Sequence, residues 1–211
     1  MTREEMYRAL EERHGAEFQK RLSEASVAVC GLGGLGSNIA TALARMGVGR
    51  LHLIDFDKVD ITNLHRQQYF PDQLGQPKID ALGDTIRRIA PYIEVVQTTI
   101  RLDSGNICDV LSGDDIICEA MDNADSKAEL VNCVLEKMPE KYLVCGSGMA
   151  GISDANEITT RRITDRFFVC GDGRSDVNDG IGLTATRVMV CAAHQAHKIV
   201  QIIRGTAKGE E

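Results

Sequence analysis

Four glycines between residues 31 and 36, in the stretch GLGGLG, are the first feature of this sequence that could do chemistry. Glycine lets the backbone approach a phosphate closely. The apolar run before the turn and the helical pattern after it place backbone N–H groups at a helix N-terminus, which attracts anions. A second apolar run at 51–54 ends in an acid that is positioned for the hydroxyls of a ribose. The spacing predicts a nucleotide site that contains Gly31, Gly33, Gly34, Gly36 and Asp55.

The glycine spacing alone does not select the nucleotide. Gly31, Gly33 and Gly36 satisfy the dinucleotide pattern, and Asp55 follows at about the right distance. NAD and FAD are therefore compatible with the turn.

The segment after Asp55 favours a triphosphate. Arg66 offers a bidentate cation and Lys78 a point charge, and both flank the turn. Asp122 follows a later apolar run, and a carboxylate beside a triphosphate is a natural Mg²⁺ ligand. We expect these residues at the carboxyl edge of one sheet, where open α/β folds bind their ligands. The same stretch also contains Asp57, Asn63 and Gln67.

An alternation of strands and helices must position these residues. Apolar runs predict strands at 27–30, 51–54, 93–98, 115–118 and 142–145, and 3.6-residue periodicity predicts helices at 78–90, 106–111, 124–137 and 183–203. Residues 156–163 alternate like an antiparallel edge strand, and 169–182 are predicted to form a mobile loop. The predicted fold class is α/β, a Rossmann-like doubly wound, mainly parallel sheet with antiparallel strands added at one edge.

The domain boundaries follow from the same pattern. Residues 2–22 are predicted to be helical, with Thr2 as N-cap, a break at Gly15 and an apolar stripe of Met6, Ala9 and Leu10. We therefore expect an N-terminal helical arm at 1–26, a single nucleotide-binding domain at 27–205 and a frayed tail at 206–211.

Composition excludes several classes of partner. The 211 residues have a net charge of −7, which argues against a nucleic-acid surface or an anionic membrane as the main partner. The sequence has no apolar run near the eighteen or so residues that span a bilayer, and MTREEMYRAL is charged where a signal peptide would be apolar. We expect a cytoplasmic protein.

The seven cysteines are scattered, and no C-x-x-C occurs. This pattern argues against a zinc site and a disulfide framework, and it fits a reducing compartment. We expect most of the thiols, including Cys30, Cys118 and Cys145 at the ends of strands, to be buried as small apolar side chains.

The motifs GLGGLG, IDFDKVDITNLHRQ, GQPK and MDNADSK resemble the ThiF-like family of ubiquitin-activating-like adenylating enzymes, which serve sulfur-carrier proteins. The resemblance runs from about residue 10 to 205, and it includes relatives in the molybdopterin pathway. Its length is that of the short ThiF branch. It implies adenylation of the C-terminal glycine carboxylate of a small ubiquitin-like carrier that ends in Gly-Gly, with release of pyrophosphate, in thiamine biosynthesis.

The resemblance also implies a role for each matching residue. The turn and Asp55 would hold ATP, Asp57 and Asn63 would line the α-phosphate region, and Arg66 and Lys78 would clamp the phosphates. Asp122 would bind Mg²⁺, with Gln67 and Asn123 beside the nucleotide. A homodimer is implied, in which Arg13 reaches the partner's ATP, and so is a sulfur-donor protein.

The sequence departs from the family pattern in two respects, and it is compatible with three alternative functions. Many relatives carry two C-x-x-C pairs for zinc, which this chain lacks, and a cysteine before the last helix, for which Cys170 is the only candidate. One rival acceptor is a tRNA-linked carboxylate or a molybdopterin carrier. The others are a nicotinamide oxidoreductase and a nucleotide-sensing module; the 26 residues before the first strand cannot supply the DNA-binding part of a regulator.

Overall fold

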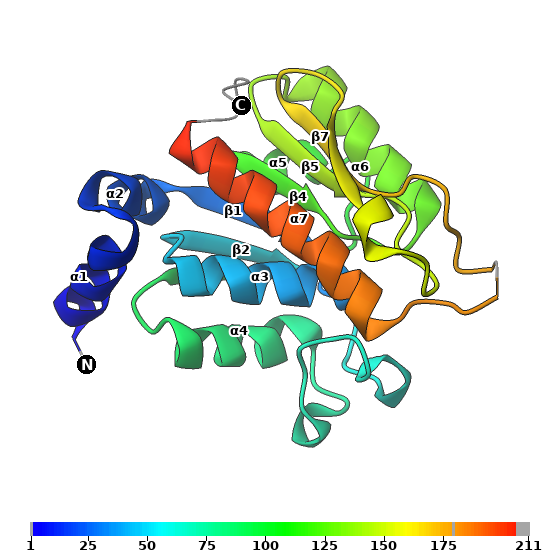
Figure 1. Ribbon diagram of the computed structural model, residues 1–211, viewed down its shortest axis with the longest axis horizontal. Coiled ribbons are helices and arrows are strands. Elements are labelled where there is room, and N and C mark those ends of the chain that lie inside the picture. The colour runs from blue at the N-terminus through cyan, green and yellow to red at the C-terminus, as the bar shows by residue number, and fades with distance from the viewer. Residues whose placement is uncertain (1, 179, 206–211) are drawn as a thin grey trace.

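A seven-stranded sheet with the order β3-β2-β1-β4-β5-β7-β6 forms the centre of the computed structural model, which describes residues 2–178 and 180–205 (Figure 1). All neighbouring strands are parallel except β6 and β7. This confirms the predicted α/β fold, with a single antiparallel edge strand. The strands are β1 (Ser26–Cys30), β2 (Arg50–Ile54), β3 (Glu94–Thr98), β4 (Ile116–Glu119), β5 (Tyr142–Gly146), β6 (Thr159–Arg162) and β7 (Phe167–Gly171).

Helices cover both faces of the sheet, which is why every residue of β1 and β4 is buried. One face carries α3 (Gly34–Met46), α4 (Lys78–Ile89) and α7 (Ala185–Arg204), and the other carries α5 (Ile107–Val110) and α6 (Ala124–Lys137) (Figure 1). Each layer has its own apolar core. Alternate residues of β1 belong to different cores, Val27 and Val29 to the first, Ala28 and Cys30 to the second.

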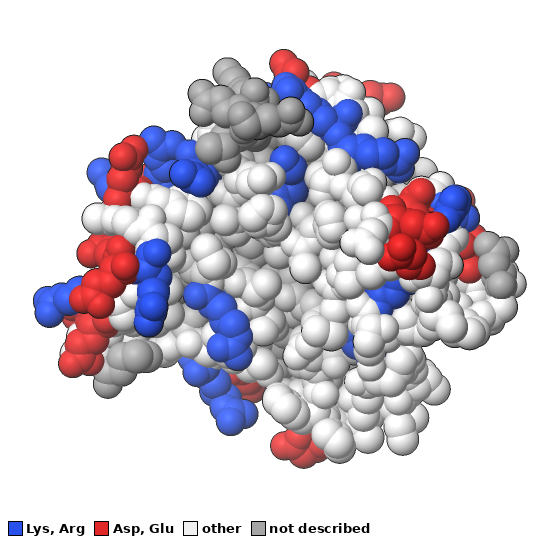
Figure 2. Space-filling view, viewed as in Figure 1, with Lys and Arg blue, Asp and Glu red and all other residues white. Residues whose placement is uncertain are grey.

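The N-terminal arm consists of α1 (Arg3–His14) and α2 (Ala16–Glu24), separated at Gly15 with φ +91°. Thr2 caps α1 in a capping box, as predicted. Of the predicted apolar stripe, Met6 and Leu10 are half-buried and Met6 packs against the core, whereas Ala9 is exposed, and no residue of α1 is fully buried. The arm lies at the amino ends of the strands (Figure 1), and charged side chains gather over it (Figure 2).

The stretch 169–182 differs from the predicted loop. Phe167–Gly171 is strand β7, which pairs with β5 on one side and β6 on the other. Cys170 therefore lies in a strand and is 0% exposed. The pairing partners are remote in sequence, so only the run FFVC signalled this strand.

The other boundaries are close to prediction. The segment between β2 and α4 contains two short 3₁₀ helices, Ile61–Asn63 and Pro71–Gln73, where one short helix was expected. The predicted tail at 206–211 lies outside the described residues. None of the described helices is long and apolar enough to cross a membrane.

Candidate functional site

A pocket of about 220 Å³ opens at the carboxyl ends of β1, β2 and β4. The strand order runs outward from β1 in one direction and from β4 in the other, so the pocket occupies the topological switch point where α/β sheets bind ligands. Its walls are the glycine turn, the ends of β2 and β4, the segment after β3 and the first residue of α4. The lining residues are Gly31, Gly33, Ile54, Asp55, Phe56, Lys78, Ile100, Arg101, Leu102, Ala120, Met121, Asp122, Asn123 and Ser126.

The glycines of the turn have different roles. Gly31 has φ +91°, and a Cβ there would lie 2.8 Å from the carbonyl oxygen of Ala120. A Cβ on Gly36 would lie 1.8 Å from the carbonyl oxygen of Gly31, so Gly36 lets α3 pack against the turn. Gly33 has no such constraint: a Cβ there would meet nothing closer than Gln67, at 3.7 Å. Gly31 and Gly33 line the pocket, whereas Gly34 faces the side chains of Val188 and Arg66.

Asp55 holds the turn in shape. Its Oδ2 accepts the N–H of Leu32 at 2.6 Å, and its Oδ1 accepts the N–H of Asp57 at 2.8 Å. The phenol of Tyr69 donates to the carbonyl of Leu32 at 2.8 Å, so both the N–H and the C=O of Leu32 are held by side chains. Burial raises the pKa of Tyr69, which keeps the phenol protonated as this donor. Asp55 also lines the pocket, and its contact with a ribose stays a prediction.

Lys78 is the buried cation of the pocket. It is 5% exposed, and its Nζ forms an ion pair with Oδ2 of Asp57 at 2.8 Å. Asp57 is half exposed and comes from the loop after β2, while Lys78 begins α4. The structure thus joins two predicted site residues 21 positions apart.

Arg66 and Asn63 form a second predicted pair. Arg66 Nη2 donates to Oδ1 of Asn63 at 2.7 Å, and its stem lies against Gly34. Burial lowers the pKa of Arg66, and the negative charge of Asp122 acts in the opposite direction. Arg66 and Asp122 therefore lie within electrostatic range of each other, although Arg66 is outside the pocket lining.

Gln67 is buried beside the turn, with its Oε1 unpartnered among the described residues. A buried amide oxygen without a partner is costly unless a ligand or water satisfies it. Together with the open space at Gly33, this atom fits a polar ligand in the turn.

Asp122 and Asn123 are exposed at the mouth of the pocket. Asn123 caps α6, with Oδ1 accepting the N–H of Ser126 at 2.9 Å. The described residues contain no group of three or more His, Cys, Asp or Glu side chains able to hold a metal ion by themselves. The donor set at this place is a single carboxylate, which suits Mg²⁺ shared with phosphate oxygens and not a closed protein site.

Two sequence-predicted residues lie away from the pocket. Arg13 is exposed on α1, which lies at the amino ends of the strands (Figure 1), whereas the residues that line the pocket follow the carboxyl ends of the strands. Cys170 is buried in β7, and burial raises the pKa of its thiol, so it is neither exposed nor activated as the loop position implied.

The sequence reasoning missed the apolar wall of the pocket and the buried charges around it. Ile100, Leu102 and Met121 follow strands, but nothing in their local sequence marks them as pocket residues. Glu119 and Lys127 form an ion pair behind Met121. In the sequence, this pair could have been recognised from an acid at the end of an apolar strand and a basic residue eight positions later, on the next helix.

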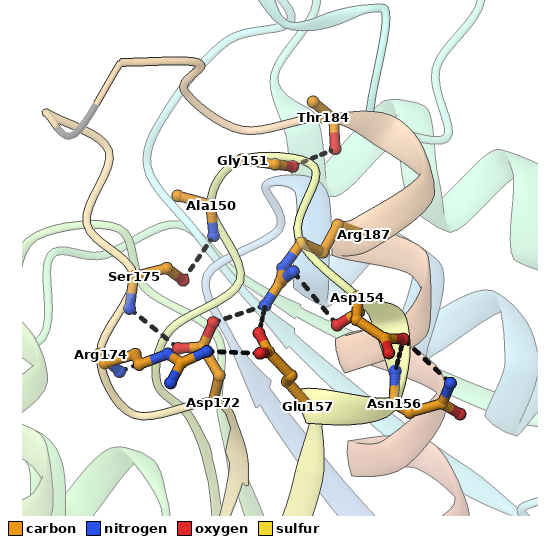
Figure 3. Close-up of polar contacts among 10 residues, drawn as sticks. All are labelled: Ala150, Gly151, Asp154, Asn156, Glu157, Asp172, Arg174, Ser175, Thr184 and Arg187. Carbon is orange, nitrogen blue, oxygen red and sulfur yellow. Dashed lines mark hydrogen bonds and ion pairs between the residues drawn. The ribbon is translucent and has the colours of Figure 1, made fainter.

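A second charge cluster, buried at Arg187 and Asp172 and exposed at Arg174, lies at the base of the loop between β7 and α7 (Figure 3). Arg187 of α7 is 3% exposed and pairs with Asp172 at 2.5 Å and with Glu157 at 3.8 Å. Arg174 pairs with Glu157 at 2.5 Å, and Asp172 also accepts the N–H of Ser175 at 2.9 Å. These contacts fasten the start of the loop to α7.

The fold is a Rossmann-type α/β fold, and its candidate site at the switch point combines a glycine turn, a buried lysine, an adjacent arginine and an exposed carboxylate. The sequence profile of the ThiF family matches residues 7–211, and the chain belongs to this family.

The curated relatives are longer proteins. The chain is 38% identical over 125 residues to the molybdopterin-synthase adenylyltransferase of Salmonella typhimurium, covering 58% of this chain and 50% of that protein. It is 37% identical over 110 residues to the sulfur carrier protein adenylyltransferase of Thermus thermophilus, covering 52% and 41% respectively. The matched segments thus span half or less of these relatives.

Among solved structures, the chain resembles the tRNA N6-threonylcarbamoyladenosine dehydratase of Escherichia coli in complex with ATP. The TM-score is 0.86 at 22% identity, and 97% of each chain is covered. At this identity the likeness establishes the shared fold.

Proposed function

We propose that this protein is an ATP- and Mg²⁺-dependent adenylyltransferase that activates the C-terminal glycine carboxylate of a small ubiquitin-like sulfur carrier. The observation that carries the proposal is the placement of Lys78, Arg66 and Asp122 around the glycine turn at the switch point. Membership of the ThiF family and the names of the curated relatives support it.

The apolar part of the pocket suits the base of ATP, and the polar part suits its phosphates. The side chains of Ile100, Leu102 and Met121 offer an apolar surface for a planar base. The N-terminal end of α3, which begins at Gly34 after the N-cap Gly33, offers first-turn N–H groups for phosphate, whereas the N–H of Gly31 is donated to the carbonyl of Ile54.

The chemistry requires positioning and charge stabilisation. Attack of a carboxylate oxygen on the α-phosphorus forms a mixed anhydride, and the bond to the departing pyrophosphate breaks. Negative charge gathers on the phosphoryl oxygens, which Lys78 and Arg66 would stabilise. Asp122 would hold Mg²⁺, which supplies further neutralisation of the phosphates. No general base is needed, because the attacking carboxylate is ionised at neutral pH.

The ion pair of Lys78 with Asp57 sets the first step. Lys78 can serve a phosphate only when that phosphate replaces or shares the carboxylate of Asp57 at 2.8 Å. We therefore expect the contact between Asp57 and Lys78 to weaken when the phosphates of ATP enter, because two anions then compete for one ammonium group.

The finer part of the proposal is the identity of the carrier protein. We expect a thiamine-type carrier, while the curated relatives named above include a molybdopterin-synthase adenylyltransferase. We further expect a homodimer and a sulfur-donor protein as partners.

Isotope exchange between pyrophosphate and ATP tests the proposal, because acyl-adenylate formation is reversible. We expect exchange with Mg²⁺ and a thiamine-type or molybdopterin-type carrier with a free Gly-Gly end, and none with the same carrier lacking its last glycine. The carrier that gives the higher kcat/KM identifies the pathway. Hydride transfer to NAD, or exchange that needs no carrier, would contradict the proposal.

A further inference from the structure

Glu119, at the end of β4, has a fully buried carboxylate. Burial raises its pKa, while Lys127 and the N–H of Met121 act in the opposite direction. A carboxylate in such a place is costly, and an apolar residue of similar volume often stabilises a fold equally well or better. The role of Glu119 must therefore be sought in the segments that its contacts hold in place.

The contacts of Glu119 and Lys127 join three elements. Oε1 of Glu119 accepts the N–H of Met121 at 2.7 Å, and Oε2 pairs with Nζ of Lys127 on α6. The same Nζ donates to the carbonyl of Gly146 at 2.8 Å, at the end of β5. One ammonium group thus links the carboxyl ends of β4 and β5 to α6.

The next residues along the chain form one wall of the pocket. Ala120, Met121 and Asp122 line it, and the carbonyl of Ala120 faces Gly31 across the turn. On the α7 side, Gln195 donates to the carbonyl of Glu119 at 2.9 Å. The backbone from 119 to 121 is therefore held from both sides, and the carboxylate of Asp122 is the first exposed group beyond it.

We propose that Glu119 and Lys127 are a positioning pair that fixes residues 120–123 as a rigid wall of the nucleotide pocket and so sets the place of Asp122. Neither residue lines the pocket. The catalytic part of this inference rests on the proposed function, whereas the structural part does not.

Amide hydrogen exchange without any substrate tests the structural part. In Lys127→Met we expect the Met121 amide to exchange at least about tenfold faster, because its acceptor loses its counter-ion. Lys127→Arg should restore protection, and Lys137→Met, an exposed lysine on the same helix, should leave it unchanged. Unchanged protection of Met121 in Lys127→Met would overturn the inference.

The double variant Glu119→Leu/Lys127→Met separates positioning from stability. An apolar pair removes the cost of the buried carboxylate but leaves the N–H of Met121 and the carbonyl of Gly146 without these partners, so we expect only a small change in the melting temperature. We nevertheless expect kcat for pyrophosphate exchange to fall at least about tenfold, with the KM for ATP within about threefold and a higher Mg²⁺ requirement, because a small displacement of a catalytic group is costly. A stable double variant with the wild-type kcat would refute positioning.

The experiments distinguish a failure of the proposed function from a failure of the positioning inference. If the wild-type protein shows no carrier-dependent exchange, the proposed function fails, and the hydrogen-exchange comparison still decides whether the pair orders residues 120–123. If wild-type exchange is present and Lys127→Met only lowers the melting temperature, the pair is structural and the inference fails.

Discussion

At the scale of single residues, the site depends on close backbone approaches as much as on charges. Gly36 illustrates this, since its missing Cβ is what allows α3 to reach the turn. Gly31 has both a positive φ and a carbonyl oxygen in the way of a side chain. These two glycines are required by geometry even before a ligand is considered.

Gly36→Ala should therefore lower the free energy of unfolding by about 3 kcal/mol or more, because the new methyl group meets backbone that cannot move alone. Gly113→Ala is the control: its Cβ would meet only Arg50, at 4.0 Å, and we expect a change within about 1 kcal/mol. Urea denaturation of both variants measures the difference. Equal stability would show that the turn can relax away from α3.

Lys78→Ala should lower the rate of pyrophosphate exchange by about two to three orders of magnitude, because one preorganised donor to the transition state is lost. Lys58→Ala removes the same charge from an exposed place on the neighbouring loop and should change the rate less than about threefold. Steady-state exchange at saturating carrier measures both. A comparable loss of exchange rate in the two variants would indicate that the reaction depends on the total positive charge and not on the position of Lys78.

Asp122→Asn should raise the Mg²⁺ concentration for half-maximal exchange by about tenfold and lower the rate, since a neutral amide is a poorer ligand for a hard cation. Asp125→Asn, exposed on the first turn of α6, serves as the matched control. Titration of Mg²⁺ after treatment with a chelator gives the two values. If Asp125 proves the more sensitive residue, the metal assignment must move to α6.

At the scale of elements, predictability followed the range of the interactions that form each one. The helix Ala124–Lys137 was predicted with its observed bounds, because its period and its cap are local. Strand β7 was missed because its hydrogen bonds go to β5 and β6. The chemistry followed the same rule: the glycine turn is contiguous, whereas the pairing of Asp57 with Lys78 and the burial of Glu119 depend on how strands and helices meet.

The loop after β7 is anchored by an acid whose ionisation is coupled to folding. Burial alone would raise the pKa of Asp172, but the N–H groups of Ser175 and Arg174, the Ser175 hydroxyl and Arg187 lower it from 3.8 to about 2. A lowered pKa stabilises the fold above the unfolded value and loses that contribution as pH falls through the folded value. The sensitive window is therefore between about pH 4 and pH 2.

Asp172→Asn should cost on the order of 2 kcal/mol at neutral pH and flatten the loss of stability between about pH 4 and 2. Asp165→Asn, whose side chain is 91% exposed, should leave the curve of stability against pH unchanged. Thermal unfolding at several pH values gives both curves. If the stability of Asp172→Asn falls with pH as steeply as that of the wild type, other carboxylates cause the acid sensitivity.

At the scale of the whole molecule, the arm lies at the amino ends of the strands (Figure 1), and the residues that line the pocket lie at their carboxyl ends. Arg13 could therefore serve only the pocket of a second copy. In an isologous dimer each arm would reach the partner's site, and both sites would be completed together.

Mixed dimers test this arrangement directly. Arg13→Ala and Lys78→Ala should each lose exchange, and an equal mixture of the two, allowed to exchange subunits, should recover about a quarter of the wild-type rate, because half of the dimers would hold one intact site. Sedimentation at micromolar concentration should show the dimer. A 23 kDa species with full activity, or a mixture without recovery, would remove the role of Arg13.

The ion pair between Lys78 and Asp57 has a consequence for selectivity. Before nucleotide arrives, the buried cation is already neutralised by a carboxylate tethered to the same chain, which competes at a high effective concentration. Free phosphate or another small anion brings only its own charge to displace that carboxylate. ATP also brings its base and ribose, and their contacts can offset the lost ion pair. If the proposed function holds, we therefore expect millimolar phosphate to inhibit the protein only weakly, whereas ATP at lower concentration still binds.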